Sequence, residues 1–367
     1  MTPAFSSRRQ AAAFALLLGV LLALPALSAR TGWLDRRDVF PTIAWNYGPF
    51  PWIQQKIFAE TADVDLAFIG SSHLWTAIDT PYVQRQLSEQ IGREAEVFTF
   101  GWPWAGFDAT YVIARDLLNH RRVHTLVIYD EEQGEDIPHQ TSFHWFRIGE
   151  NSEALDGLSW QMQASLYGGA VLGMPRHLLS FVRPNLLEDP ANCRANQWNS
   201  YYRAPNLSER LGSLRAQLGY YRSQEKFLPF QARGHATPAD VLVYSAETRD
   251  AFQFTSPAAK PYQFHFARKL AQLCQERGTR LVVLHTPNLR ECGESLIIER
   301  RLWPEVLGAP VDIVGVPPAK LFAGIPTADV MKLFYDDNHL NQNGQEMFTR
   351  LIAPVLLTLY AAPTYRN

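Results

Sequence analysis

Residues 64–73, Val-Asp-Leu-Ala-Phe-Ile-Gly-Ser-Ser-His, decide how this chain is interpreted. Their first part, 64–69, is a short apolar run, which is typical of a strand buried on both faces of a parallel sheet. Gly70 allows the chain to turn sharply where this strand ends. We therefore expect Ser71 and Ser72 to emerge at the carboxyl end of the strand, close to the start of a helix.

Strands and helices alternate on both sides of this stretch. Strands are expected at 95–100, 125–129 and 280–284, with a weaker one at 311–316, and helices at 81–92, 108–119, 262–277 and 344–360. Such alternation predicts an α/β fold, a three-layer α/β/α sandwich of flavodoxin-like outline with a largely parallel sheet. Ligands of such sheets bind beyond the carboxyl ends of the strands.

The pattern divides the chain into four parts. We expect a signal peptide or membrane anchor over 1–30, a connector over 31–62, and an α/β domain over 63–362. Within that domain, 131–257 shows scattered helical spacing and few strand signals, so we interpret it as a long, mostly helical insertion.

The amino-terminal segment carries the information on location. Residues 11–29 contain no charged side chain and follow Arg8 and Arg9. A cleaved signal peptide and an uncleaved anchor both fit this pattern, and we favour the anchor because the apolar run nearly reaches the length of a membrane span. The polar domain behind it is then expected outside the cytoplasm, in the periplasm and anchored to the inner membrane, or secreted if the segment is cleaved.

Composition excludes several classes of protein. The chain has 367 residues, 47% of them apolar and 19% charged, so it can form a sizeable core. Its formal charge of −2 argues against a non-specific nucleic-acid binder. Three cysteines are too few for a disulfide scaffold or a Cys-rich zinc module. Two interpretations stay open for them: a Cys193–Cys292 pair with a buried Cys274 thiol, or three free thiols.

A second motif lies near the carboxyl terminus, Asp336-Asp337-Asn338-His339-Leu340-Asn341. In a helical turn, Asp336 and His339 would project from the same side. A carboxylate that accepts the N–H of one imidazole nitrogen fixes the tautomer and leaves the other nitrogen free as a base. A serine with such a base can attack a carbonyl carbon. The alternative is a polar loop capped by Asn341 or Asn343.

Taken together, the two motifs resemble the SGNH/GDSL hydrolase superfamily. Gly70-Ser71-Ser72-His73 is similar to its Gly-Asp-Ser-Leu block, and Asp336-x-x-His339 to its Asp-x-x-His block before a terminal helix. The resemblance implies an SGNH fold with Ser72, Asp336 and His339 as a catalytic triad.

The resemblance also implies an oxyanion hole. Its donors would be the backbone N–H of Ser72 and that of a glycine after the second strand, where both Gly101 and Gly106 are candidates. The family's Asn after the third strand has no counterpart here, and Gln133 is a candidate substitute donor.

Other residues are candidates with equally plausible structural roles. His73 would contact substrate or cap and pack, and Trp102 and Trp104 would stack on a sugar ring or belong to the core. The acidic run 130–136 lacks calcium-loop spacing and is expected to be solvated.

No metal site and no cofactor are expected. His120 and His124 lie across a helix-to-strand junction, which does not suit zinc.

These observations predict a serine-dependent acyl-ester enzyme. Together with the apolar amino-terminal segment, the resemblance points to the branch that O-acetylates exported or cell-surface polysaccharides, which implies a glycan substrate and a membrane-bound O-acyltransferase partner. An SGNH-type esterase is the first alternative. The second alternative is a catalytically inactive scaffold subunit of a polysaccharide-modification assembly. The third is a purely structural exported domain.

Overall fold

The computed structural model describes residues 5–31, 50–102, 106–130, 158–165, 167–168, 171, 234–255, 261–299, 302–334 and 336–364. The chain divides into two compact units, Met1–Asn46 with Pro138–Asp189, and Tyr47–Ile137 with Pro190–Asn367.

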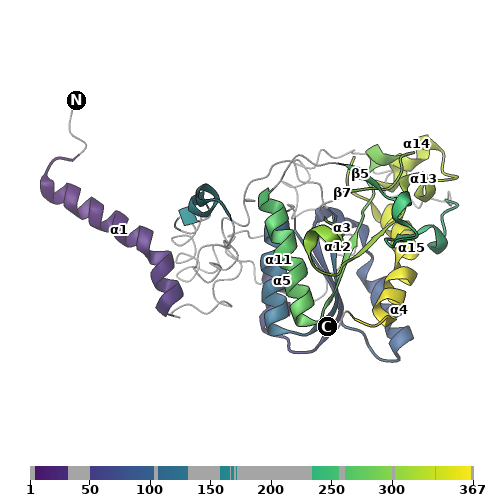
Figure 1. Ribbon diagram of the computed structural model, residues 1–367, viewed down its shortest axis with the longest axis horizontal. Helices are drawn as coiled ribbons and strands as arrows, with labels where there is room; N and C mark the ends of the chain where they lie inside the picture. Colours follow the sequence, from purple (N-terminus) through teal and green to yellow (C-terminus); the bar gives the residue numbers. More distant parts are fainter. Residues whose placement is uncertain are drawn as a thin grey trace. The chain divides into compact units, whose positions relative to one another are not determined.

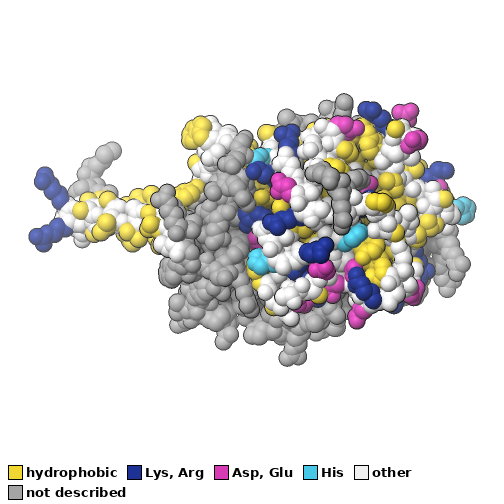
Figure 2. Space-filling view, turned by 60° about the horizontal axis from the view of Figure 1, so that its bottom comes forward, with side chains coloured by type: hydrophobic (Ala, Val, Ile, Leu, Met, Phe, Trp, Pro, Cys, Tyr) yellow, Lys and Arg dark blue, Asp and Glu magenta, His cyan; other side chains and the backbone are white. Residues whose placement is uncertain are grey.

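The described part of the first unit is mainly the helix α1 (Arg8–Thr31). Apolar side chains along α1 are exposed, among them Leu16 and Leu17 (Figure 2). The hydroxyl of Tyr167 donates a hydrogen bond to the carbonyl oxygen of Leu22. Among the helices that the structure describes, none has both the length and the apolar character needed to cross a membrane. The interpretation of the segment 11–29 as a signal or anchor stays a prediction.

The second unit is built on a six-stranded sheet. In spatial order its strands are β2 (Val97–Trp102), β1 (Val64–Ser71), β3 (Val123–Tyr129), β6 (Arg280–Leu284), β8 (Asp312–Gly315) and β4 (Leu242–Val243). All neighbouring strands are parallel except β4, which pairs antiparallel with β8. The predicted α/β class with a largely parallel sheet is therefore confirmed.

Helices cover both faces of this sheet (Figure 1). On one face α5 (Phe107–His120) and α11 (Pro261–Arg277) lie side by side, and on the other lie α4 (Thr80–Ile91) and α15 (Gln342–Ala361). The remaining helices are α2 (Phe50–Phe58), α3 (Ser72–Ala77), α12 (Pro304–Leu307), α13 (Pro318–Leu321) and α14 (Thr327–Val330). Single 3-10 turns are η5 (Pro238–Asp240), η6 (Arg249–Ala251), η7 (Leu289–Glu291) and η9 (Met331–Leu333).

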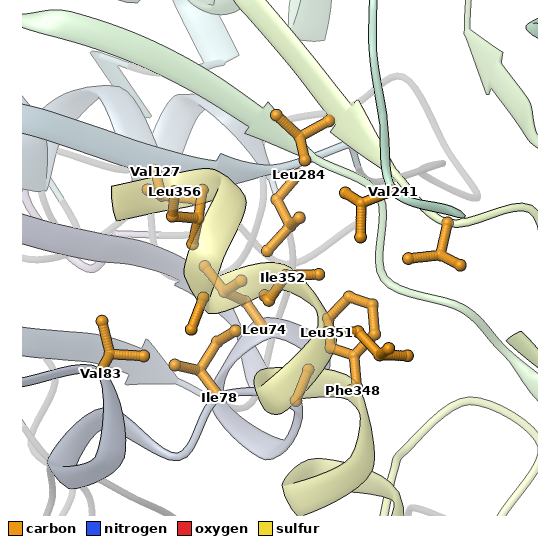
Figure 3. Packing of buried hydrophobic residues seen from close by; sticks show 14 of the residues in the cluster. Leu74, Ile78, Val83, Val127, Val241, Leu284, Phe348, Leu351, Ile352 and Leu356 are labelled. Carbon is orange, nitrogen blue, oxygen red and sulfur yellow. The ribbon is translucent and has the colours of Figure 1, made fainter. Parts of the chain in front are cut away.

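The core beside the candidate site is formed by α15 and the sheet (Figure 3). Phe348, Ile352 and Leu356 of α15 are buried together with Val127 of β3 and Leu284 of β6. Full burial of each such side chain contributes about 1.5–3 kcal/mol. The apolar face predicted for the last helix thus fixes the segment that precedes it, residues 336–341, against the carboxyl ends of the strands.

Local signals set the ends of the helices. Asp79 accepts the N–H of Tyr82 at 3.2 Å and caps α4. Asn341 caps α15 by accepting the N–H groups of Asn343 and Gly344 at 2.9 and 3.2 Å. Of the two predicted caps, Asn341 is therefore the one that the structure uses.

Several short elements were not predicted. β4 belongs to the main sheet although it lies inside the segment 131–257, and β5 (Gln253–Thr255) pairs with β7 (Ile297–Glu299) in a second, two-stranded sheet. Strands of two or three residues contain too few positions to show a period of two. Most of 131–257 lies outside the described residues, so the predicted helical insertion stays a prediction.

The predicted connector, 31–62, contains the helix α2, whose Trp52 is buried. The Trp52 ring meets the Phe100 ring of β2 edge to face, with centroids 5.4 Å apart. This part of the connector is therefore packed into the second unit.

Candidate active site

Ser72 lies where β1 ends and α3 begins. The two elements are joined without a loop, and the Ser71 hydroxyl caps α3 by accepting the N–H of His73 at 3.3 Å. A Cβ on Gly70 would lie 3.0 Å from Leu74 Cδ2, so the absence of a side chain at residue 70 lets the chain turn closely onto α3. This turn places Ser72 at the carboxyl end of the central part of the sheet.

Asp336 and His339 lie in a short loop rather than in a helical turn. The Oδ1 atom of Asp336 accepts the backbone N–H groups of Asn338 and His339, each at 2.8 Å. This is the local side-chain-to-backbone bonding that Asp favours in turns. Asn341 holds the base of the loop, because its side-chain amide donates to the carbonyl oxygens of Lys332 and Phe334 at 2.7 and 3.2 Å.

The structure brings the three predicted triad residues together. Ser72 Oγ lies 2.9 Å from His339 Nε2, although the two residues are 267 positions apart in the chain. His339 Nδ1 lies 2.8 and 2.9 Å from the two carboxylate oxygens of Asp336. All three residues are buried, with 3–5% of their surfaces exposed. The distances match those required of a nucleophile, its general base and the group that orients the base.

The surroundings of Asp336 favour its ionised form. Burial acts to raise the pKa of Asp336, but the hydrogen bond and charge of His339 and the two backbone N–H groups outweigh it, so the pKa lies below its ordinary value. Asp336 is therefore a carboxylate at neutral pH. A carboxylate here requires the Nδ1–H tautomer of His339, which leaves Nε2 free to accept the Ser72 proton.

His73 forms one wall of the site. Its ring meets the His339 ring edge to face, with centroids 4.5 Å apart, and its Nδ1 lies 2.7 Å from the hydroxyl of Tyr129 at the end of β3. Burial, with a contribution from His339, lowers the pKa of His73 to about 3. The ring is thus neutral at pH 7 and has one donor and one acceptor nitrogen. Tyr129 was not a predicted site residue, although its place at a strand's carboxyl end was a usable signal.

The two candidate oxyanion glycines differ in their surroundings. A Cβ on Gly101 would lie 2.2 Å from Trp75 Cγ, so packing against α3 already explains glycine at this position. Gly106 precedes α5 with φ of 155°, a backbone conformation that favours glycine.

Three predicted residues lie at the limit of the described residues or beyond it. Trp102 is the last residue of β2, whereas Trp104 and Gln133 lie outside the described residues.

The expectation for the acidic run is wrong at its first residue. Asp130 is only 8% exposed, and its carboxylate lies 2.6 Å from Nδ1 of His285, whose Nε2 lies 3.1 Å from the carboxylate of Glu291. The pairing depends on β3 and β6 being neighbours in the sheet, which local sequence spacing does not reveal. The rest of 131–136 lies outside the described residues.

His120 and His124, the two histidines considered for zinc, have different hydrogen-bond partners. His120 Nδ1 lies 2.7 Å from the Asp116 carbonyl oxygen, and His124 Nδ1 lies 2.9 Å from the Thr125 hydroxyl. Cys274 and Cys292 are free thiols and Cys274 is buried, whereas Cys193 lies outside the described residues.

No protein-family model matches the chain, and no curated protein is significantly similar to it. The function is therefore inferred from the chain's own residues and their arrangement.

Proposed function

We propose that this protein is a serine-dependent acyl-ester enzyme in which Ser72 is the nucleophile, His339 the general base and Asp336 the group that orients it. The observation that carries the proposal is the continuous chain of contacts from Ser72 Oγ to His339 Nε2 at 2.9 Å, and from His339 Nδ1 to Asp336 at 2.8 Å. A mostly parallel sheet with helices on both faces is what the SGNH-type sandwich proposed for this chain requires.

The first half of the reaction forms an acyl-enzyme. Ser72 Oγ bonds to the acyl carbon of the ester while its proton passes to His339 Nε2, and the carbonyl electrons move onto the oxygen. Asp336 stabilises the imidazolium that forms. His339 then gives the proton to the leaving alkoxide as the ester C–O bond breaks. Such acid–base transfer typically contributes 10²–10⁴-fold in rate.

The developing oxyanion needs donors that are already in place. We propose the backbone N–H of Ser72 and that of a glycine after β2. Of the two candidates, Gly106 is favoured, because the contact with Trp75 accounts for Gly101 without any catalytic role.

The second half of the reaction depends on the acceptor. His339 takes a proton from an incoming hydroxyl, whose oxygen bonds to the acyl carbon. The bond between Ser72 Oγ and the acyl carbon then breaks, and His339 returns the proton to Ser72 Oγ. A sugar hydroxyl makes the protein an O-acyltransferase, and water makes it an esterase.

We propose O-acyl transfer, with acetyl as the expected group, to an exported or cell-surface polysaccharide. The motif resemblance and the uncharged segment 11–29 behind Arg8 and Arg9 support it. A membrane-bound O-acyltransferase is the proposed partner, because acyl-CoA is a cytoplasmic donor.

One observation favours the alternative of an inactive scaffold. The residue directly after β3 is Asp130, a carboxylate engaged by His285 at 2.6 Å, and a carboxylate cannot donate a hydrogen bond to an oxyanion. A site with one donor fewer is typically 10²–10³-fold slower.

An alkyl fluorophosphonate separates the enzyme from the scaffold. Its phosphorus accepts the oxygen of an activated serine and releases fluoride, so the full-length wild-type chain is expected to be labelled and Ser72→Ala is not. Ser71→Ala is the matched control, because it removes only the cap of α3, worth about 1 kcal/mol, and is expected to stay reactive. A folded wild-type chain that is not labelled supports the scaffold. Acetyl transfer from 4-nitrophenyl acetate to an oligosaccharide, against release of acetate, then separates transferase from esterase.

A further inference from the structure

A second cluster of charged side chains, two buried and one half-buried, lies at the same edge of the sheet as the triad. β1, β3 and β6 are consecutive strands, Tyr129 pairs with Leu284, and a Cβ on Gly70 would lie 3.5 Å from Tyr129 Cβ. Asp130 directly follows β3 and His285 directly follows β6, so both residues leave the sheet at the level at which β1 delivers the nucleophile.

The cluster consists of Asp130, His285 and Glu291. Asp130 Oδ2 lies 2.6 Å from His285 Nδ1, and Glu291 Oε2 lies 3.1 Å from His285 Nε2. Each of these N···O contacts needs a proton, and a neutral imidazole supplies only one. The two contacts together therefore require one proton more than a neutral imidazole and two carboxylates contain. Because both ring nitrogens are engaged, His285 has no nitrogen left to act as a base on a substrate.

The surroundings keep this proton bound. Burial acts to lower the pKa of His285, but the charges and hydrogen bonds of Asp130 and Glu291 outweigh it and raise the pKa well above its ordinary value. Burial also raises the pKa of Asp130. From β8, the Val314 carbonyl oxygen accepts the backbone N–H of His285 at 2.8 Å, and Gly315 lies beside the His285 Cβ. Over the described part of the chain, the charged groups on the ring are thus the two carboxylates.

The cluster is connected to the catalytic loop through η7. The Glu291 carboxylate accepts the side-chain amide of Asn288 at 2.7 Å and so closes this turn. From the turn, Leu289 donates its N–H to the Asp337 carbonyl oxygen at 2.7 Å, and Arg290 Nη2 lies 3.0 Å from the Asp337 carboxylate. Asp337 directly follows the triad aspartate.

We propose that Asp130, His285 and Glu291 form a positioning network that holds the loop 336–339 so that His339 stays aligned with Ser72, and that this alignment weakens when the network loses its proton at alkaline pH. The inference rests on the proposed function, because alignment matters only if Ser72 reacts. The sign follows from the raised proton affinity of His285: the stabilisation is complete at low and neutral pH and is lost as the pH rises through the titration of the folded network.

Glu291→Gln is the informative variant. It removes one of the two negative charges on His285 but keeps the size of the side chain and an acceptor oxygen. Replacing His285 itself would leave the buried carboxylate of Asp130 and the half-buried carboxylate of Glu291 without a cation, which tests folding rather than alignment. Glu294→Gln is the matched control, since Glu294 is an exposed carboxylate three residues further along.

The test is the rate at which a fluorophosphonate labels Ser72 in the full chain between pH 6 and 10. We expect the wild-type rate to decline at alkaline pH, and the decline in Glu291→Gln to begin about one pH unit lower, a tenfold loss of proton affinity. Glu294→Gln is expected to follow the wild type. Equal midpoints for wild type and Glu291→Gln, or a rate reduced by the same factor at every pH, would overturn the proposal.

A second readout keeps the two proposals distinguishable. If the wild type is not labelled at any pH, the proposed function fails, and the network is tested by amide hydrogen exchange at Asn338 and His339. Protection at least tenfold lower in Glu291→Gln than in Glu294→Gln supports the network. Equal protection in the two variants overturns it.

Discussion

Asp336→Asn tests the orienting role of the carboxylate. Oδ1 of Asp336 accepts two backbone N–H groups at 2.8 Å, so the oxygen of an asparagine will occupy this position and its NH₂ group the position of Oδ2. That NH₂ group then lies about where Oδ2 is now, 2.9 Å from His339 Nδ1. An amide donor there favours the tautomer with the proton on Nε2, which cannot accept the proton of Ser72.

The expected loss follows from this tautomer change and from the lost negative charge. The same substitution in serine-protease triads lowers kcat about 10⁴-fold. Because the Oδ1 position still offers an acceptor to Nδ1 at 2.8 Å, we expect a loss of about 10³–10⁴-fold, or about 4–5.5 kcal/mol.

The assay is kcat/KM for 4-nitrophenyl acetate, with thermal unfolding to show that the fold is retained. Asp329→Asn is the control, because Asp329 pairs with the exposed ammonium of Lys332 at 2.7 Å and has no part in the proposed mechanism, and it is expected to match the wild type. A folded Asp336→Asn protein within threefold of the wild type would refute the reasoning.

Three further outcomes are expected. Gly344→Ala places a Cβ 2.2 Å from a carbonyl oxygen of η9, so it should lower the free energy of unfolding by about 1–3 kcal/mol in denaturant titrations; an unchanged midpoint would contradict the packing. Burial acts to raise the pKa of Asp65, but hydrogen bonds, chiefly from Arg93, outweigh it and lower the pKa. Asp65→Asn should therefore have a lower melting temperature than the wild type at pH 7. The difference between the two melting temperatures should narrow as the pH falls below about 4, and a difference that is the same at every pH would contradict the lowered pKa of Asp65. Tyr129→Phe removes the hydroxyl 2.7 Å from His73 Nδ1 and should lower kcat/KM about five- to tenfold, and unchanged kinetics would exclude a role for this contact.

Elements with a clear apolar period were predictable from the sequence. The strand β6 has the predicted bounds, Arg280–Leu284, and α15 buries Phe348 and Ile352 as its spacing of apolar residues requires. The start of a helix beside Ser72 was expected, but the bounds of α3 were not predicted, because six residues, almost all of them buried, are too few to show a helical period.

The candidate site was predictable where its residues are marked by local sequence. Asp336 and His339 are three positions apart, and Ser72 follows a recognisable strand. The contact between Asp130 and His285 was not predictable, because it joins residues 155 positions apart through the neighbouring places of β3 and β6 in the sheet. Strand order of this kind depends on the packing of the whole unit.

The most direct measurement is the location of the acyl group in the covalent intermediate. The full-length protein is mixed with 4-nitrophenyl acetate at pH 7, quenched in acid within the first turnover, digested and mapped by mass spectrometry. The proposed mechanism predicts one acetyl group on Ser72, lost on further incubation and absent from Asp336→Asn at the same time point. Acetyl on Ser71 or only on lysines, with Ser72 unmodified, would contradict it.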